Sequence, residues 1–497
     1  MERLKRKQHN GLVKIVTGVR RCGKTYLLFN IFRKYLLESG VSEKNIITLR
    51  LDDIANVEFL NPLSLYQHIK SQIVDGEQYY VLLDEIQLVS KFEDVLNGLL
   101  HLGNVDVYVT GSNSRFLSSD IITEFRGRGD EIRLYPLSFA EFFSVYKGTL
   151  DEAWNEYRIY GGMPMLVNIA DREEKKTYLE NLFSQVYLSD IINRYNLRGN
   201  LEIGELTDVV ASIVGSLTNP LRIANAFNSM KQKKVTTPNT IGTYLQYMEE
   251  AFLIRKAMRY DIRGKQYINT PYKYYFTDIG LRNARLNFRQ LESGHLMENI
   301  IYNELCRRGL SVDVGDVEVV VKNENGDCVR KHLEVDFVVN QGSRRFYIQS
   351  AAVLDTREKM SQETASLKHI SDSFKKIVIQ QDNTEPWYNE DGILVLSLMD
   401  FLLKQDVLNM YIAGQRPAGK KRMRFRRALR GGKVWAKFSP TVTKLRRACR
   451  DAVHIVSTTE YDEPFTGTVE TGRAPSLHRT SPTKTKGRHG GTAPALR

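Results

Sequence analysis

The first 150 residues alternate between short apolar runs and stretches in which apolar side chains recur at helical spacing. The apolar runs predict strands at residues 14–17, 45–51, 79–83 and 106–110, and helical spacing predicts helices at residues 26–38, 62–74 and 91–102. Alternating strands and helices are typical of a parallel sheet covered by helices on both faces. We therefore expect residues 1–150 to form an α/β domain.

Beyond Ser138 the pattern changes to helices and then to a hairpin. Helical spacing predicts a helical lid or connector over residues 151–204, and more helices follow as far as residue 251. Extended segments at residues 252–260 and 272–276 complete a winged-helix-like region, residues 205–290. A helix from Gly294 and the strands after it predict a small α/β domain over residues 291–404.

A glycine-rich segment joins the first strand to the first helix, and it matches the pattern G-x-x-x-x-G-K-T of a phosphate-binding loop, or P-loop. Its residues are Gly18, Val19, Arg20, Arg21, Cys22, Gly23, Lys24 and Thr25. Such a loop turns its backbone N–H groups toward the phosphates, and the helix that follows adds the positive end of its dipole. We expect Lys24 to meet the β- and γ-phosphates of ATP and Thr25 to bind Mg²⁺.

Two acids end the apolar strand that begins at Tyr79. Asp84 is expected beside the P-loop, where its carboxylate would order Mg²⁺. Glu85 is then positioned as a general base that polarises the attacking water. The sequence thus predicts a P-loop NTPase sheet that binds ATP and Mg²⁺ and hydrolyses ATP.

Polar residues also end the next strand, where a sensor of the γ-phosphate would lie. Ser112 and Asn113 are the candidates for that role. Further on, Arg126 and Arg128 could supply an arginine to the transition state, although solvated loop arginines are an equal alternative.

Five segments resemble a widespread bacterial and archaeal family of AAA-type ATP-binding proteins. They are GVRRCGKT, LLDEIQ, VTGSNS, GRGDEIRLYPLSFAEF and YGGMP, and the resemblance continues through TIGTYLQYMEEAFLI, KYYFTDIGLRN and LEVDFVV to about residue 404. The resemblance implies an additional-strand ATPase core, a winged helix, and a C-terminal domain of unknown function with a restriction-endonuclease-like fold. It implies no particular cellular task.

Nucleases of the implied C-terminal fold use a helix Glu, a strand Asp, and Glu or Gln followed two residues later by Lys. Their carboxylates hold Mg²⁺, and the Lys helps to position water or to stabilise developing charge. Glu298, Asp336 and Gln349 match the first three positions, but Ala351 stands where the Lys is expected. Alanine offers neither a charge nor a hydrogen bond to a developing anion. We expect this site to be degenerate, unless a lysine from elsewhere, such as Lys359 or Lys368, takes that place.

The expected recognition helix of the winged-helix region, residues 237–251, has no Lys or Arg and carries Glu249 and Glu250. A helix that reads the major groove normally displays basic or amide side chains. We therefore favour a packing role for this helix.

The chain carries 71 Lys and Arg against 58 Asp and Glu, a net charge of +13. Residues 413–497 contain 20 of those basic residues and 5 of the acidic ones, so the remainder of the chain has a net charge of −2. We expect a basic, disordered tail over residues 405–497, because it lacks apolar periodicity. Four scattered cysteines and the absence of a long apolar run favour a cytoplasmic protein outside the membrane.

Three functional hypotheses follow from these patterns. The leading one is a Mg²⁺-dependent ATPase that acts as a nucleotide switch or remodeller. The second is a DNA-directed effector in which ATP gates the nuclease-like domain, and the third is a nucleotide-binding scaffold that does not hydrolyse ATP. A protein partner or self-association is compatible with all three, whereas the charge of residues 1–412 does not support a DNA partner.

Overall fold

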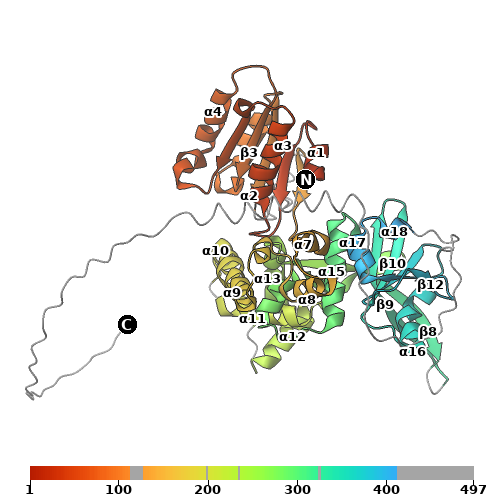
Figure 1. Ribbon diagram of the computed structural model, residues 1–497. Coiled ribbons are helices and arrows are strands. Elements are labelled where there is room, and N and C mark those ends of the chain that lie inside the picture. Colours follow the sequence, from red (N-terminus) through yellow and green to blue (C-terminus); the bar gives the residue numbers. More distant parts are fainter. Residues whose placement is uncertain (112–126, 198–199, 233–235, 323–325, 411–497) are drawn as a thin grey trace, which may run out of the picture.

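The computed structural model describes residues 1–111, 127–197, 200–232, 236–322 and 326–410. Figure 1 shows an N-terminal sheet with its helices, and below it a larger part that contains all the later elements. Within these described ranges, no helix is both long enough and apolar enough to cross a membrane.

The N-terminal sheet has five parallel strands in the order β2-β3-β4-β1-β5. The strands are β1 (Val13–Thr17), β2 (Ile46–Arg50), β3 (Tyr79–Asp84), β4 (Val105–Gly111) and β5 (Gly129–Arg133). β4 lies between the strand that precedes the P-loop and the strand that ends in Asp84. The first domain is therefore the expected P-loop NTPase fold, and the inserted β4 is the additional strand that the resemblance implied.

Helices cover both faces of this sheet, as the alternating pattern predicted. Buried side chains of α4 (Pro62–Gln72) and α5 (Phe92–Leu100) pack against one face. On the other face lies a continuous helix that follows the P-loop, together with α1 (Glu2–Arg6). That continuous helix consists of α2 (Lys24–Tyr26), the π-helical segment η1 (Leu27–Phe32) and α3 (Arg33–Glu38).

The larger part contains a set of helices in addition to its sheet, and we call this set the linking helices. It comprises α7 (Phe139–Val145), α8 (Leu150–Tyr160), α9 (Arg172–Asn181), η7 (Leu182–Leu188), α10 (Ser189–Tyr195), α11 (Asn200–Ser212), α12 (Pro220–Met230), α13 (Pro238–Glu250) and α14 (Ile279–Arg285). α7 and α8 each begin with a capping box, in which a hydroxyl accepts a backbone N–H and a Glu three residues later returns the bond. The glycine pair after Tyr160 ends α8.

The second sheet has eight strands in the order β12-β13-β11-β10-β9-β8-β6-β7. Its strands are β6 (Ile254–Asp261), β7 (Gln266–Phe276), β8 (Ser311–Lys322), β9 (Cys328–Gln341), β10 (Arg344–Ala351), β11 (Lys375–Gln380), β12 (Trp387–Tyr388) and β13 (Leu394–Ser397). β6 pairs with β8, so the expected wing hairpin and the expected C-terminal domain share one sheet. The boundary that we placed at residues 290/291 therefore falls between strands of one sheet.

Helices on opposite faces of the second sheet complete the larger part. α15 (Ser293–Arg307) contributes to the cluster on one face, together with α17 (Leu398–Leu403) and α18 (Val407–Met410). α16 (Arg357–Lys368) contributes Leu367 to the cluster on the other face. Val407 and Leu408 are buried in the first of these clusters. The expected start of the tail at residue 405 is thus too early, because packed side chains continue past it; residues 411–497 lie outside the described part of the chain.

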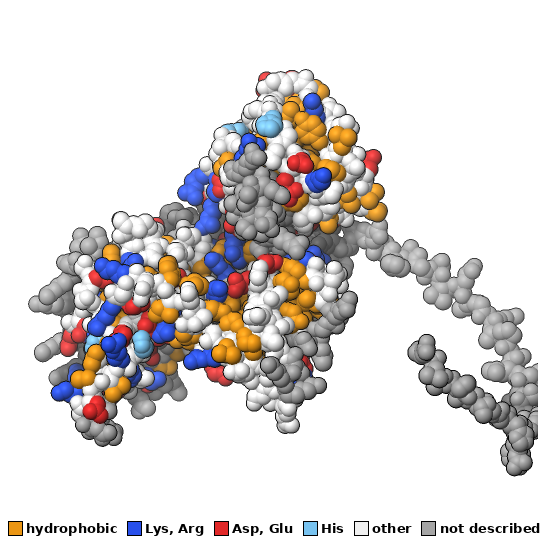
Figure 2. Space-filling model, turned by 180° about the vertical axis from the view of Figure 1, so that it is seen from behind, with side chains coloured by type: hydrophobic (Ala, Val, Ile, Leu, Met, Phe, Trp, Pro, Cys, Tyr) orange, Lys and Arg blue, Asp and Glu red, His pale blue; other side chains and the backbone are white. Residues whose placement is uncertain are grey.

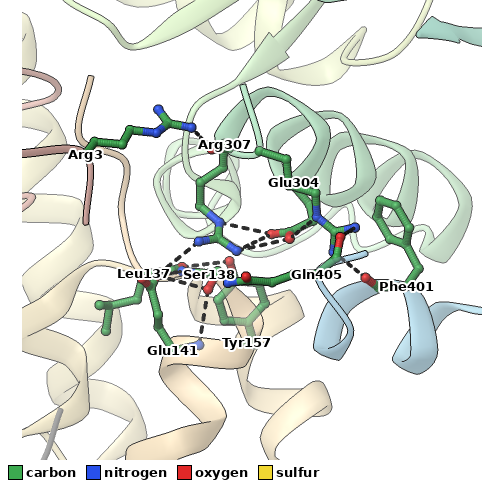
Figure 3. Close-up of polar contacts among 10 residues, drawn as sticks. Arg3, Leu137, Ser138, Glu141, Tyr157, Glu304, Arg307, Phe401 and Gln405 are labelled. Atoms are coloured by element: carbon green, nitrogen blue, oxygen red, sulfur yellow. Dashed lines mark hydrogen bonds and ion pairs between the residues drawn. The ribbon is translucent and has the colours of Figure 1, made fainter. Parts of the chain in front are cut away.

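A charged cluster joins the ATPase domain to the larger part (Figure 3). Glu304 of α15 accepts hydrogen bonds from Arg307 at 2.9 Å and from Arg308 at 2.7 Å. Arg307 also lies 3.8 Å from the carboxylate of Glu141 on α7, and its carbonyl accepts a 2.8 Å hydrogen bond from Arg3. The first helix of the chain is thereby bound to a helix of the second sheet.

Candidate nucleotide site

The P-loop has the backbone conformation that its glycines predicted. Gly18 and Gly23 have φ values of 147° and 94°, in the region that favours glycine. A Cβ atom on Gly18 would overlap the carbonyl oxygen of Leu134, the residue that follows β5. Gly23 caps α2, so the loop leads directly into the helix N-terminus. The loop is therefore packed tightly against the edge of the sheet.

Lys24 is buried, and its ammonium group points into the loop. Its Nζ donates to the carbonyl oxygens of Gly18 and Val19, at 3.0 and 3.1 Å. The positive charge of Lys24 thus lies at the centre of the curved loop, where a phosphate group of a bound nucleotide would lie.

Asp84 lies at the end of β3, buried and close to Thr25. Its Oδ1 accepts a hydrogen bond from Thr110 of β4. Within the described residues, Oδ2 of Asp84 has no hydrogen-bond partner. Burial raises the pKa of Asp84, and hydrogen bonds from Thr110 and Thr25 oppose that rise. A buried carboxylate oxygen beside a threonine hydroxyl fits the preference of Mg²⁺ for oxygen ligands.

Glu85 follows Asp84 and has a φ of 51°, which is uncommon for a residue with a side chain. Its backbone N–H donates to the hydroxyl of Thr110 at 3.0 Å, and its carboxylate accepts a hydrogen bond from Gln87. Thr110 thereby holds both acids of the site.

The structure does not place Arg128 near the P-loop of its own chain. Arg128 precedes β5 and donates to Asn97 of α5 at 3.2 Å. β5 runs parallel to β1, so the P-loop lies at the opposite end, near Arg133. At about 3.3 Å per residue, that is roughly 15 Å of strand. The catalytic role predicted for Arg128 is therefore wrong for its own site, while Ser112, Asn113 and Arg126 lie outside the described residues.

Two residues that the sequence did not single out bind the P-loop from the linking helices. The hydroxyl of Tyr187 donates to the carbonyl oxygen of Arg20 at 2.8 Å. Asp190 of α10 forms an ion pair with the Arg20 guanidinium at 2.6 Å. No spacing rule connects residues 167 positions apart, so a single sequence holds no signal for this contact.

The apolar side chains of the P-loop also belong to the larger part of the molecule. Val19 and Cys22 are buried in the hydrophobic cluster formed by the linking helices and the second sheet. Neither belongs to the clusters on the two faces of their own sheet. Burial raises the pKa of the Cys22 thiol, which is consistent with a packing role.

Arg133 stands at the P-loop end of β5, against two aromatic rings. Its guanidinium lies 4.6 Å from the ring centre of Phe252 and 5.5 Å from that of Tyr135. Arg255 of β6 donates to the Tyr135 hydroxyl at 2.7 Å. Burial and the charge of Arg255 lower the pKa of Arg133. These contacts add to the joint between the ATPase domain and the second sheet.

The residues expected for a nuclease-like site do come together. Glu298 lies on α15, Asp336 on β9 and Gln349 on β10, and the Gln349 oxygen accepts the backbone N–H of Asp336 at 3.3 Å. Burial raises the pKa of Glu298 to about 7. The residue that the sequence analysis missed is Lys273 of β7, which contacts Glu298 at 2.8 Å.

The helix at the position of a recognition helix, α13, packs its apolar side chains inward, and its two glutamates have tyrosine neighbours. Ile241, Leu245 and Met248 are buried. Glu250 accepts a hydrogen bond from Tyr195, and burial raises the pKa of Glu249, which is hydrogen-bonded to Tyr274. On the face of the molecule in Figure 2, acidic and basic side chains are interspersed over the larger part.

Comparison with known proteins finds two matching family models and several relatives. A family model described as an AAA domain matches residues 10–143, and one for a domain of unknown function (DUF8612) matches residues 151–292. An uncharacterized protein of Haemophilus influenzae is 34% identical over 401 residues, which cover 79% of this chain and 94% of the relative. Uncharacterized protein MJ1544 of Methanocaldococcus jannaschii is 28% identical over 408 residues, covering 78% of this chain and 85% of the relative.

Solved structures also show similarity, at low identity. The ORC1 protein of Aeropyrum pernix in complex with DNA matches with 12% identity and a TM-score of 0.28, covering 57% of this chain and 91% of that protein. The ORC2 protein of the same organism, in ADPNP–ADP complexes, matches with 13% identity and a TM-score of 0.28, covering 51% and 84%.

Proposed function

Since the chain belongs to the AAA-domain family that includes the uncharacterized Haemophilus influenzae protein, we propose that it is a Mg²⁺-dependent ATPase that works as a nucleotide switch. The state of the nucleotide in the P-loop would set the position of the linking helices and, through them, of the second sheet.

The P-loop domain contains the groups that this chemistry needs. Lys24 would exchange the carbonyl oxygens of Gly18 and Val19 for phosphate oxygens of ATP. Thr25 and the buried Oδ2 of Asp84 would hold Mg²⁺, directly or through water. Bound Mg²⁺ supplies positive charge that offsets the charge of the phosphates during their transfer.

Glu85 is the residue that we propose as the general base. Gln87 contacts its carboxylate and Thr110 fixes its backbone, so the side chain has a defined position next to Asp84. A carboxylate held in this way can draw a proton from water as the water attacks the γ-phosphate. Asp84 is better suited to the metal, because it is almost fully buried.

One observation carries the switch proposal: the P-loop is bound by its side chains and its backbone to the helices of the larger part. Val19 and Cys22 pack in the core of that part, and Tyr187 and Asp190 bind Arg20. A rearrangement of the loop around phosphates must therefore be accommodated by α10 and by the helices packed on it. Coupling of this kind requires an element whose position both sites influence, and α10 is such an element.

Hydrogen exchange with and without ATP and Mg²⁺ tests the proposal. We expect the Glu85→Gln variant, which keeps ATP bound, to show altered exchange in residues 178–195. The Tyr187→Phe/Asp190→Asn variant should bind ATP but lose that distant response. The matched control is Tyr178→Phe/Asp171→Asn, which changes the same residue types on α9 and just before it and should behave as the parent.

The outcome that would exclude a switch is equally defined. If ATP protects only the P-loop and leaves exchange in residues 178–195 unchanged, the nucleotide does not act on the linking helices and the switch proposal fails. If the distant response persists in the Tyr187→Phe/Asp190→Asn variant, another contact carries the coupling.

A further inference from the structure

The nuclease-like residues of the second sheet surround a lysine that comes from the hairpin. Lys273 of β7 lies 2.8 Å from Glu298 and 2.6 Å from Glu334, and only 2% of its surface is exposed. Burial lowers the pKa of Lys273, but the nearby carboxylates of Glu298, Asp336 and Glu334 raise it further, so that the net shift is upward. One ammonium group therefore lies among the carboxylates that the resemblance assigned to a metal.

One carboxylate oxygen of each acid in this cluster already has a polar partner. Oε1 of Glu298 accepts the Lys273 ammonium and also a hydrogen bond from the Tyr275 hydroxyl at 2.6 Å. Its Oε2 lies against Gly215, where a Cβ atom would be only 3.1 Å away. Oδ2 of Asp336 accepts hydrogen bonds from the backbone N–H and the hydroxyl of Ser350, at 2.8 and 2.7 Å. The loop after α11 thus closes over the cluster.

These residues do not fit a divalent cation. Mg²⁺ requires nearly octahedral oxygen ligands at about 2.0–2.1 Å, and the carboxylate oxygens nearest Lys273 are already bound by its ammonium group and by the Tyr275 hydroxyl. Among the residues that the structure describes, no group of three or more His, Cys, Asp or Glu side chains could hold a metal ion. A buried ammonium with two carboxylates in contact instead satisfies the requirement that buried charges be paired.

We propose that Lys273 replaces the divalent cation of the nuclease-like site and turns that site into a metal-independent ionic joint. The joint fixes the end of the β6–β7 hairpin to α15 and β9, and it leaves no position for a metal-activated water. The second sheet then moves together with the linking helices as one rigid body. This inference is independent of whether the P-loop hydrolyses ATP.

A double-mutant cycle on stability tests the ionic joint. Lys273→Met leaves three carboxylates near one another without a cation, and removing one partner of a buried pair is strongly destabilising. We expect the folding equilibrium constant to fall at least about a hundredfold. Lys331→Met is the control, because it makes the same change at an exposed site on β9 and should alter the constant less than about threefold. Adding Glu298→Gln to Lys273→Met should recover about tenfold, since it removes one of the unpaired charges.

Metal binding to the parent protein gives a second test, which does not need Lys273→Met to fold. Without nucleotide, the melting temperatures of the parent and of Asp336→Asn should respond equally to Mn²⁺. A Mn²⁺-induced rise that is present in the parent and lost in Asp336→Asn would overturn the proposal. So would equal stability of the Lys273→Met and Lys331→Met variants.

Plasmid nicking decides the functional consequence. Parent protein with Mg²⁺ and ATP should cleave DNA no more than Asp336→Ala does. Cleavage by the parent that disappears in Asp336→Ala would show a working nuclease site and overturn the ionic joint, and Lys273 would then supply the charge that Ala351 lacks.

Discussion

The carboxylate of Asp278 accepts a hydrogen bond from the backbone N–H of Gly162 at 2.8 Å, although the two residues are 116 positions apart. The other oxygen of Asp278 accepts the N–H of Leu281 and so caps α14. A Cβ atom on Gly161 would overlap Asp278, and one on Gly280 would overlap the carbonyl oxygen of Tyr160. The YGGMP and FTDIGLRN segments of the family resemblance therefore pack against each other with their backbones in close contact.

Asp278 makes the stability of this joint depend on pH. Burial raises its pKa to about 6 from an ordinary value of 3.8. The folded protein therefore binds a proton at Asp278 that the unfolded chain releases above pH 4. The contribution of Asp278 to stability is complete below about pH 4 and is lost as the pH rises through 6.

We expect Asp278→Asn to remove this dependence, because an amide does not titrate in this range. Between pH 4 and pH 7, the free energy of unfolding of the variant should gain about 3 kcal/mol relative to the parent. Urea unfolding followed by tryptophan fluorescence measures it. Asp171→Asn, at the exposed cap of α9, is the control and should keep the slope of the parent. An unchanged slope in Asp278→Asn would contradict the prediction.

The second prediction concerns Lys24, whose ammonium is the cation at the centre of the P-loop. Lys24→Ala should abolish the rise in melting temperature that ATP and Mg²⁺ give the parent, since the phosphates lose their main counter-charge. Thermal shift measures this, and Lys34→Ala on the exposed side of α3 should retain the full rise. An equal shift in the Lys24→Ala variant would disprove the assignment of the P-loop.

The third prediction separates binding from hydrolysis. Glu85→Gln should bind ATP as the parent does, while turnover falls by roughly a hundredfold or more, because the amide cannot take up a proton. Steady-state phosphate release and nucleotide affinity are the two measurements. The exposed Glu58, changed to Gln, should leave both unaltered. Equal turnover in Glu85→Gln and parent would place the general base elsewhere.

The fourth prediction fixes the end of the folded part. Removing the residues after Met410 should leave the melting temperature and the ATP turnover unchanged. Removing the residues after Gln405 should lower the melting temperature, because it also deletes Val407 and Leu408, which are buried. Burial of one such side chain stabilises the folded state by about 1.5–3 kcal/mol. The same truncation also removes the Leu408 carbonyl that Lys375 binds at 2.8 Å. Equal stability of the two truncated forms would contradict this.

The sequence predicted the P-loop domain because each strand there is a short apolar run and each helix has one apolar face. β5 was missed, since it begins with Gly129, Asp130 and Glu131 and looks like a polar loop. The acids at the end of β3 were predicted by local pattern alone, and the structure places Asp84 beside Thr25. The local sequence pattern was sufficient to predict those site residues that lie on consecutive loops of one parallel sheet.

Contacts between distant segments could not be predicted in the same way. Tyr187 reaches Arg20, and Lys273 reaches Glu298 and Glu334, only because the tertiary fold brings them together. Lys273 lies in a hairpin strand whose sequence pattern is typical of an edge strand, so nothing in the local sequence indicates that Lys273 is buried. Arg128 does not reach the P-loop of its own chain, because strand direction, not proximity in sequence, decides which end of β5 meets the P-loop.

The pairing of β6 with β8 limits where the chain can be cut into fragments, or recombined with a relative, without disrupting the second sheet. A gene fragment that begins at residue 291 would encode β8 with an open edge, and Glu298 without its lysine. An exposed strand edge invites association with other chains, and an unpaired buried charge disfavours folding. Recombination that exchanges the C-terminal module between relatives should therefore carry the hairpin with it, with crossovers upstream of Ile254.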